Sequence, residues 1–552
     1  MIETIKVIID NRNYKISKDT TLLELSSEFQ KNFKYPIILA KVNGHIKELT
    51  TKVTADSKIE FLDLTSKEGN RTHISGLTYV LIYAIKKLYG KNANAIVLHS
   101  LDKGIYIETN FDLTANKIKA IKDKMNSIIK SAMPITKVTV ERFEAIKYFK
   151  DIKDYVKVGV MTYNTNSYVT LYRLGNYYNY FYNYMPPSTD KLASFDLTYI
   201  DDKGFMLRFP TIYINDKIKP YKHHPGMFEV FNDYRKWSKI MGLESSVDLN
   251  KIVSEGKIND LIRIDETLQN NKLLEIARSI NDHKDKIKVI LIAGPSSSGK
   301  TTTSIKLCTF LQSFGLNPKV LGMDDYFVDR ENNPKDKDGN YDYECLEAID
   351  IKLFNDQVEQ LLSNKEILIP TYNFITGKKE FKNKMKLQNN DILIIEGIHA
   401  IDTHILDNIE RNKKFKIYIS ALTELNIDDH NRISTTDHRL LRRIIRDNRT
   451  RGYDVETTIK NWASVRNGEE KYIFPYQDEA DVTLNSALIY EMGVLKTYVE
   501  PLLYSVQDTS PYYEEAKRLI RFLQMFFPIP SDAIPQDSVL REFIGNGCFH
   551  DW

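Results

Sequence analysis

Eight consecutive residues near the middle of the chain have the types and spacing of a phosphate-binding loop. Residues 294–301 read Gly-Pro-Ser-Ser-Ser-Gly-Lys-Thr, after an apolar run at 289–293 and before a helical pattern that begins at Thr302. Glycines let such a loop turn tightly enough to aim backbone N–H groups at phosphates, while Lys300 reaches the β- and γ-phosphates and Thr301 offers a hydroxyl to Mg²⁺. A Gly/Ser surface turn would not need the flanking strand and helix. The residues predicted to bind ATP are Gly294, Ser296, Ser297, Ser298, Gly299, Lys300, Thr301 and Thr302.

Two acidic residues follow predicted strands in the same region. Asp324 ends the run at 320–323 and is followed by Asp325, and Glu396 ends the apolar run at 391–395. Mg²⁺ prefers a few protein oxygens and keeps several waters, which suits Thr301 with one or two carboxylates. We expect Asp324 to be the general base and a magnesium-side group, and Glu396 to be a magnesium ligand. The alternative is that each acid only caps a helix.

Four arginines share one face of a predicted helix at 437–451. Arg439, Arg442, Arg443 and Arg446 are spaced i, i+3, i+4 and i+7, while leucines and isoleucines occupy the opposite face. Such a stripe of like charge is unfavourable unless an anion or an acidic partner meets it. A triphosphate is one such anion, so the stripe predicts a mobile arginine lid over the nucleotide. The alternative is salt bridging to Asp437, Asp447 or the acidic pair at 428–429.

Strands and helices alternate around these motifs. Strand-like runs at 289–293, 319–323, 391–396, 416–420 and 481–484 are separated by helical patterns. This alternation predicts an α/β fold with a doubly wound parallel sheet, whose ligands gather at the carboxyl ends of the strands.

Length and composition are those of an ordinary globular protein of several domains. The chain has 552 residues, 42% hydrophobic and 27% charged, with a formal net charge of +3. The near balance of charge gives no general support for nucleic-acid binding, so any RNA contact would be local. Three scattered cysteines favour a reducing compartment, and we find neither a signal peptide nor a run of 18 apolar residues. We expect a cytoplasmic protein with no membrane segment, and a homo-oligomer.

The front of the chain has a different pattern. Residues 1–64 show two strands, a helix and further strands, which predicts a β-grasp unit that resembles the TGS domain of threonyl-tRNA synthetases. Residues 65–280 show a mixed α+β pattern and a helical linker, and resemble the editing domain of those synthetases. The positions of the family's editing site are held by Ser75, Tyr79, Phe181 and Met185, which cannot replace its histidines and cysteine. The resemblance therefore implies the shape without the hydrolysis.

A run of tyrosines lies in the same unit. Tyr178, Tyr180, Tyr182 and Tyr184 would share one face if residues 177–184 form a strand. They could stack unpaired bases, but such platforms usually carry interleaved basic residues, so core packing is the preferred interpretation.

Residues 285–510 resemble the uridine kinase and phosphoribulokinase family of P-loop kinases, and residues 511–552 add a helix and a tail. The resemblance is carried by the phosphate-binding loop and by five further motifs: Met323-Asp-Asp-Tyr-Phe327, Pro370-Thr-Tyr-Asn-Phe374, Ile395-Glu-Gly-Ile398, the arginine run 439–446 and Ala480-Asp-Val482.

The resemblance implies roles for individual residues. Asp324 matches the catalytic aspartate and Tyr372 an aromatic residue of the nucleoside pocket. The sugar-binding aspartate aligns with Glu344 or, with two extra residues, with Asp342, which we prefer. The lid arginines then divide into Arg442 and Arg446, which act with Lys300 in catalysis, Arg443 at the ATP, and Arg439 at the substrate.

One departure from the family concerns the acceptor. Uridine-cytidine kinases carry a histidine five residues after the pocket tyrosine, where this chain has Gly377, which offers no hydrogen bond to a pyrimidine. The leading hypothesis is ATP- and Mg²⁺-dependent phosphorylation of a nucleoside 5′-hydroxyl. The alternatives are a kinase of another small hydroxyl substrate and a nucleotide-sensing, RNA-associated regulatory protein.

Overall fold

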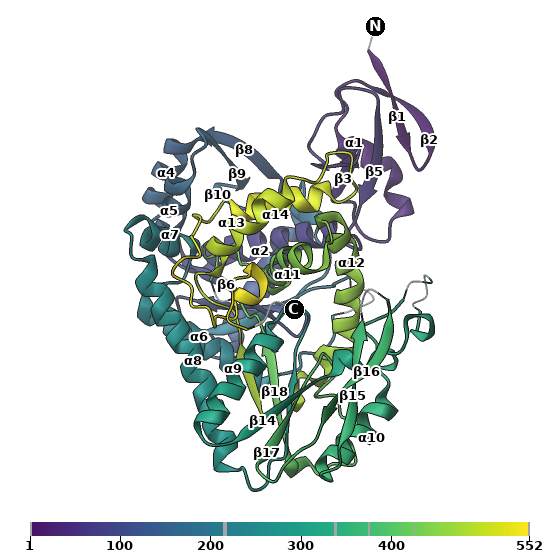
Figure 1. The fold of residues 1–552 in the computed structure, drawn as a ribbon. Helices are drawn as coiled ribbons and strands as arrows, with labels where there is room; N and C mark the ends of the chain where they lie inside the picture. The colour runs from purple at the N-terminus through teal and green to yellow at the C-terminus, as the bar shows by residue number, and fades with distance from the viewer. Residues whose placement is uncertain are drawn as a thin grey trace.

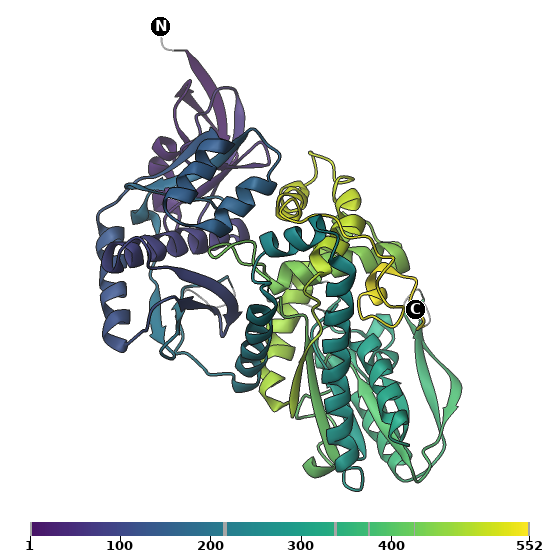
Figure 2. The same ribbon diagram turned by 90° about the vertical axis from the view of Figure 1, so that its left-hand side faces the viewer.

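The computed structural model describes residues 3–212, 218–335, 339, 341–373, 376–423 and 425–549. Phe374 of the predicted acceptor motif lies outside these ranges. A small unit at the N-terminus stands at the top of the molecule in Figure 1, above a larger body that contains the rest of the chain. Figure 2 shows the front of the chain on one side and the C-terminal half on the other. No helix in the described ranges is both long enough and apolar enough to cross a membrane.

The first unit is the predicted β-grasp. Its five strands pair in the order β2-β1-β5-β3-β4, with β1 parallel to β5. Every second residue of β1 is buried, and these side chains pack with Leu22 and Leu25 of α1. Thr21 and Glu24 form a capping box that fixes the start of that helix. The elements are β1 (Thr4–Ile9), β2 (Arg12–Ser17), α1 (Leu22–Phe29), β3 (Leu39–Val42), β4 (His45–Glu48) and β5 (Ser57–Leu62).

The second unit packs two small sheets around a long helix, α2. One sheet has the order β11-β12-β7-β6 and the other β10-β9-β8. The elements are α2 (Lys67–Tyr89), β6 (Ala95–Leu101), β7 (Gly104–Thr109), α3 (Ala115–Lys130), β8 (Ile135–Glu141), α4 (Arg142–Asp151), α5 (Tyr155–Tyr163), β9 (Tyr168–Leu174), β10 (Tyr177–Asn179), β11 (Asp196–Tyr199) and β12 (Gly204–Arg208).

The four positions that align with the synthetases' editing site are filled by packed side chains. Tyr79, Phe181 and Met185 belong to one buried cluster, and the rings of Tyr79 and Phe181 lie 5.3 Å apart. The Tyr79 hydroxyl donates to the carbonyls of Tyr172 and Tyr177 at 2.6 and 2.8 Å. Ser75 is also buried. These positions therefore stabilise the core of the unit.

Residues 177–184 form a strand only over their first three residues. Strand β10 ends at Asn179, and the chain then continues without regular structure. Tyr180 packs into a buried cluster, and the ring of Tyr182 lies 6.5 Å from that of Phe522. Because their partners come from several elements, these tyrosines do not need the alternation of a strand to become buried.

The C-terminal half contains the predicted parallel sheet. Its order is β14-β17-β13-β18-β19, and every neighbouring pair is parallel. A separate hairpin, β15 and β16, follows α10. The elements are β13 (Val289–Ala293), α9 (Lys300–Ser313), β14 (Asn317–Gly322), α10 (Ile351–Leu362), β15 (Ile367–Asn373), β16 (Lys378–Met385), β17 (Asp391–Glu396), β18 (Lys414–Ser420), α11 (Thr435–Arg451), α12 (Val455–Gly468), β19 (Val482–Asn485) and α13 (Glu491–Leu503).

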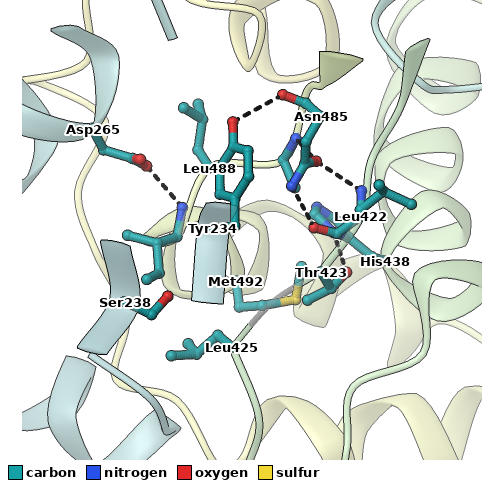
Figure 3. Close-up of a pocket in the computed structure, with 12 residues that line it drawn as sticks. Tyr234, Ser238, Asp265, Leu422, Thr423, Leu425, His438, Asn485, Leu488 and Met492 are labelled. Carbon is teal, nitrogen blue, oxygen red and sulfur yellow. Dashed lines mark hydrogen bonds between the residues drawn. The ribbon is translucent and has the colours of Figure 1, made fainter. Parts of the chain in front are cut away.

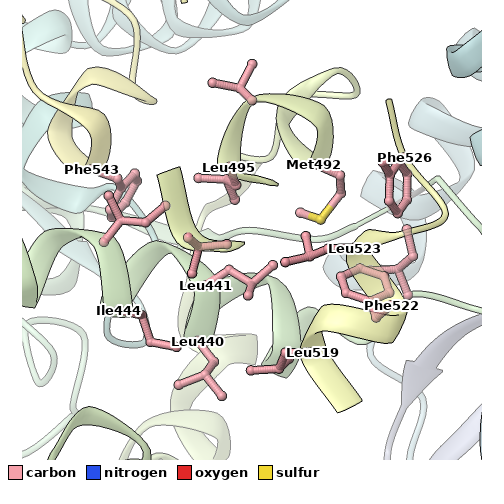
Figure 4. Close-up of a cluster of buried hydrophobic side chains, with 14 of the residues drawn as sticks. Leu440, Leu441, Ile444, Met492, Leu495, Leu519, Phe522, Leu523, Phe526 and Phe543 are labelled. Carbon is pink, nitrogen blue, oxygen red and sulfur yellow. The ribbon is translucent and has the colours of Figure 1, made fainter. Parts of the chain in front are cut away.

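Segments before and after this sheet complete its core. The linker helices are α6 (Pro225–Met241), α7 (Ser246–Ser254) and α8 (Ile258–Asp282), and the last two helices are α14 (Tyr513–Leu523) and α15 (Arg541–Ile544). Apolar residues of α8 share a buried cluster with β13, β17, β18 and α9. Figure 4 shows Leu441 of α11 between side chains of α13, α14 and α15. The arginine-bearing helix is therefore enclosed on its apolar face.

The front of the chain is joined to the C-terminal half by buried polar contacts. Lys157 Nζ lies 2.8 Å from Asp428 Oδ1, and both side chains are fully buried. Asn426 Nδ2 donates to the carbonyl of Val97 at 2.8 Å. Because a buried charge needs its partner, these contacts fix the second unit against the segment that precedes α11.

Candidate active site

The loop between β13 and α9 has the backbone of a phosphate-binding loop. Gly299 has φ +81°, which glycine adopts without strain, and it begins α9 directly before Lys300. A Cβ atom at Gly294 would lie 2.0 Å from the carbonyl oxygen of Ile419, so only glycine fits beside β18. Among the described residues, the hydroxyls of Ser297 and Ser298 are buried without a hydrogen-bond partner. These unused polar groups fit a phosphate ligand.

A hydroxyl and a carboxylate meet at the carboxyl ends of β13 and β17. Thr301 Oγ1 donates to Glu396 Oε1 at 3.1 Å, and within the described ranges Glu396 Oε2 is buried without a partner. Burial raises the pKa of Glu396 to about 7, while the Lys300 ammonium opposes that shift. Oxygen donors of this kind fit a Mg²⁺ ion, which Thr301 and Glu396 would hold and which would neutralise phosphate charge when bound.

The two aspartates after β14 are placed differently. Asp324 is exposed in the 3-10 turn at Met323–Tyr326 that follows β14, at the strand end next to Glu396. Asp325 Oδ1 instead accepts the backbone N–H of Tyr372 at 3.2 Å. Asp325 therefore fixes the β15–β16 hairpin, and Asp324 is the carboxylate that solvent can reach.

Two arginines of the predicted lid lie in buried ion pairs. Arg442 is fully buried, with Nη2 2.7 Å from Glu491 Oε2 and 2.9 Å from the carbonyl of Ser486. Burial alone would raise the pKa of Glu491, but Arg442 holds it below its ordinary value. Arg439 pairs with the buried Glu469.

The buried contacts of these two residues differ from those expected of a mobile arginine lid over the nucleotide. Arg439 Nε donates to the carbonyl of Ser296 at 2.9 Å, and Arg442 Nη1 lies 3.4 Å from that of Ser297. The like charges of α11 are balanced by buried carboxylates that the alternative interpretation did not include. Arg439 and Arg442 thus support the loop's backbone, where the sequence suggested contacts with substrate and reacting phosphate.

The other two arginines lie nearer to solvent. Arg443 Nη1 donates to Ser296 Oγ at 2.8 Å, and Arg443 Nε contacts Asp447 Oδ2 at 3.1 Å. Arg446 Nη2 lies 2.8 Å from Asp447 Oδ1. Asp447 therefore fixes both guanidinium groups. It is one of the acids that the sequence suggested as salt-bridge partners of this stripe.

The two candidates for the sugar-binding carboxylate also differ. Asp342 Oδ1 accepts the backbone N–H of Glu344 at 3.0 Å and so closes a turn. Burial raises the pKa of Glu344 to about 7, and the charges of Arg443, Asp324 and Lys300 act on it. Asp342 therefore closes the turn that precedes Glu344, and the pKa of Glu344 is affected by the same charged groups that surround the phosphate-binding loop.

Arg330 fills the place of a side chain at Gly377. Gly377 has φ +70°, and a Cβ atom there would lie 2.7 Å from Arg330 Cβ and 2.9 Å from its Nε. The Arg330 amide donates to the carbonyl of Gly377 at 2.9 Å. The side chain of Tyr372 is buried, with its ring 5.6 Å from that of Phe327. A histidine at position 377 would require this loop to rearrange.

A small cavity is lined by residues of α6, α8 and α11 and by residues that follow β18 and β19. Figure 3 shows Tyr234, Asn485 and His438 among the residues that line it. Asn485 exchanges two 2.8 Å hydrogen bonds with the backbone of Leu422, and His438 Nε2 lies 2.9 Å from Glu491 Oε1. The polar groups of this cavity support the strand ends and the Arg442–Glu491 pair.

The sequence motifs gave no signal for the acids that organise the site. Glu469, Glu491 and Glu542 come from α12's end, α13 and α15, and none belongs to a recognisable pattern. Glu542 Oε2 accepts from the hydroxyl and the amide of Thr302 at 2.9 and 3.2 Å. Long-range packing alone brings these carboxylates to the loop and its arginines.

Comparison with known proteins gives different relatives for the N-terminal and C-terminal parts of the chain. A profile of the Phosphoribulokinase / Uridine kinase family matches residues 289–489. The uridine kinase of Borrelia duttonii (strain Ly) is 28% identical over 240 residues, which cover 41% of this chain and 100% of that kinase. The threonine–tRNA ligase of Desulforamulus reducens is 26% identical over 255 residues, covering 44% of this chain and 39% of the ligase. The solved D-glycerate 3-kinase of Cryptococcus neoformans var. grubii serotype A is 12% identical, with a TM-score of 0.21, covering 48% of this chain and 89% of that one.

The parallel sheet, the loop and the matched region define a P-loop kinase domain. This region is similar to the Phosphoribulokinase / Uridine kinase family, and the N-terminal region is similar to threonine–tRNA ligases. The chain spans 39% of the length of the ligase named above. The matched family includes phosphotransferases, and it implies ATP and typically Mg²⁺.

Replacing Arg442 tests the structural role of the buried arginines. The change Arg442→Met removes the guanidinium group from the buried Glu491 and leaves that carboxylate with His438, so we expect a loss of about 3–5 kcal/mol in the free energy of unfolding. In Arg446→Met, Asp447 keeps Arg443 and Arg451 as partners, so we expect a loss below about 1 kcal/mol. Chemical denaturation measures both, and equal losses would contradict this division.

The raised pKa of Glu396 predicts a pH dependence of Mg²⁺-dependent nucleotide binding. The carboxyl group is protonated below its pKa of about 7 and charged above it, so affinity for MgATP should rise by roughly 10-fold between pH 6 and pH 8. Glu396→Gln should remove this rise in affinity with pH, whereas Glu344→Gln should keep it. Titration calorimetry at three pH values measures the difference, and the same pH profile in wild type and Glu396→Gln would disprove the assignment.

Proposed function

We propose that this chain transfers the terminal phosphoryl group of ATP to the hydroxyl of a small molecule, with nucleosides as the leading class of acceptor. The contact that carries the proposal is Thr301 with Glu396, at the strand end beside the exposed Asp324. A hydroxyl acceptor, a phosphate-binding loop and a strand-end base are what phosphoryl transfer requires.

Each polar group has a proposed task. Lys300 and the amides of the loop bind the β- and γ-phosphates, and Arg443 and Arg446 balance charge from the solvent side. Asp324 accepts the proton of the acceptor hydroxyl as its oxygen forms the new bond to the terminal phosphorus and the bond to ADP breaks. Arg439 and Arg442 act indirectly, because they hold the backbone of the loop in place.

The acceptor pocket is proposed to lie between the β15–β16 hairpin and the loop that precedes α10. Tyr372 supplies an aromatic wall, and Glu344 is the carboxylate best placed to bind the hydroxyls of a sugar. Asp342 holds the turn that presents Glu344.

A second class of acceptor is favoured by Arg330. Its side chain crosses Gly377 and acts on Tyr372, which brings a cation to the side of the pocket where pyrimidine kinases have a histidine. A guanidinium group binds phosphate well. A phosphorylated alcohol, such as a sugar phosphate, is therefore the alternative to an uncharged nucleoside.

An acceptor panel tests the proposal. We expect ADP release with MgATP to accelerate with at least one member of a set of nucleosides and sugar phosphates, and Asp324→Asn to lower that rate about 100-fold or more because the general base is lost. Asp325→Asn is the matched control, since its amide oxygen can still accept the N–H of Tyr372. A normal rate in Asp324→Asn, or no active acceptor, would refute the proposal.

A further inference from the structure

The C-terminal end of the chain returns to the phosphate-binding loop. We call residues 537–545 the C-terminal strap; this yellow segment lies at the centre of the molecule in Figure 1 and contacts α11. Leu540 and Phe543 are fully buried in the cluster around α11. The strap is therefore a packed part of the domain.

Polar contacts hold the strap at both ends. Nζ of Lys306, in α9, lies 3.1 Å from Oδ2 of Asp537. Arg449 of α11 donates to the carbonyls of Glu542 and Phe543 at 3.0 and 3.3 Å. The strap thus bridges the helix that begins at the phosphate loop and the helix that carries the arginines.

The strap places a carboxylate on the start of α9. Glu542 Oε2 lies 3.2 Å from the amide nitrogen and 2.9 Å from the hydroxyl oxygen of Thr302. Val539 covers Gly299 so closely that a Cβ atom there would lie 2.5 Å from Val539 Cγ1. Helix N-termini bind anions through such amides, and in this family of loops the anion is a phosphate. Glu542 therefore accepts hydrogen bonds from Thr302, a residue that the sequence predicts to bind ATP.

We propose that Glu542 is an intramolecular anion that competes with the nucleotide's phosphates for the N-terminus of α9, so that the strap lowers the chain's affinity for nucleotide. The inference rests on the proposed function, because it requires a loop that binds ATP. Two effects act together: Thr302 is already engaged, and a fixed negative charge repels the incoming phosphates. Nucleotide binding and docking of the Glu542 side chain then exclude each other.

The alternative to this competition is that Glu542 only caps the N-terminus of α9. A cap would stabilise α9, and its loss would leave nucleotide affinity unchanged or weaker. Competition predicts the opposite sign, so affinity separates the two roles even if the variant is somewhat less stable. The apolar residues of the strap can stay packed in both cases, since the movement required is that of one side chain and its turn.

The experiment is titration calorimetry of MgATP with the full chain. Glu542→Ala should bind roughly 10-fold more tightly than wild type, because a charge-assisted hydrogen bond no longer has to be displaced. Glu542→Gln, which keeps the shape and loses the charge, should also gain affinity. Asp532→Asn, an exposed carboxylate of the same C-terminal region, is the matched control and should change affinity less than twofold.

The outcomes separate the two proposals. Measurable binding that is equal in wild type, Glu542→Gln and Glu542→Ala, or weaker in the variants, overturns the competition and leaves the kinase proposal standing. No binding in any of the three proteins overturns both. Hydrogen exchange gives an independent check: MgATP should speed exchange in the turn at Arg541–Ile544 of the wild type, and unchanged or slower exchange there would overturn the competition.

Discussion

Buried charge pairing behind the phosphate-binding loop is the constraint on which the site depends. Arg439 and Arg442 donate to backbone carbonyls of the loop, and Glu469 and Glu491 balance their charge in the protein interior. With these carbonyls held by the arginines, the buried hydroxyls of Ser297 and Ser298 are left without a partner in the part of the chain that the structure describes and can meet a ligand. A buried guanidinium without its carboxylate is strongly unfavourable, so the loop, α11 and α13 are stable only as one assembly.

The same constraint explains why so much of the chain surrounds one small sheet. Helix α11 buries its apolar face against α13, α14 and α15, and the linker helix α8 covers the sheet itself. The second unit contributes Lys157 to Asp428 just before α11. Its positions that align with the synthetases' editing site hold core residues such as Tyr79 and Phe181. Part of the role of the synthetase-like region is thus to enclose the kinase domain.

Local patterns were sufficient to predict much of the fold. The loop octet, the parallel sheet and the acids at strand ends follow from residue spacing, because each depends on neighbours in sequence. The arginine stripe was recognised, but its partners were not, since Glu469 and Glu491 lie 30 and 49 residues beyond Arg439 and Arg442. Glu542 lies 240 residues from Thr302. Contacts of this kind follow from tertiary packing and carry no sequence period.

The central claim is that this enclosed loop grips the phosphates of ATP through Lys300. Equilibrium titration of MgATP into wild type and Lys300→Ala tests it most directly. The account predicts one binding event in the wild type that is weakened at least about 10-fold in Lys300→Ala, since the lysine supplies a charge-assisted contact to the β- and γ-phosphates. Unchanged affinity for MgATP in Lys300→Ala would contradict it, because the nucleotide would then bind at a site other than the loop.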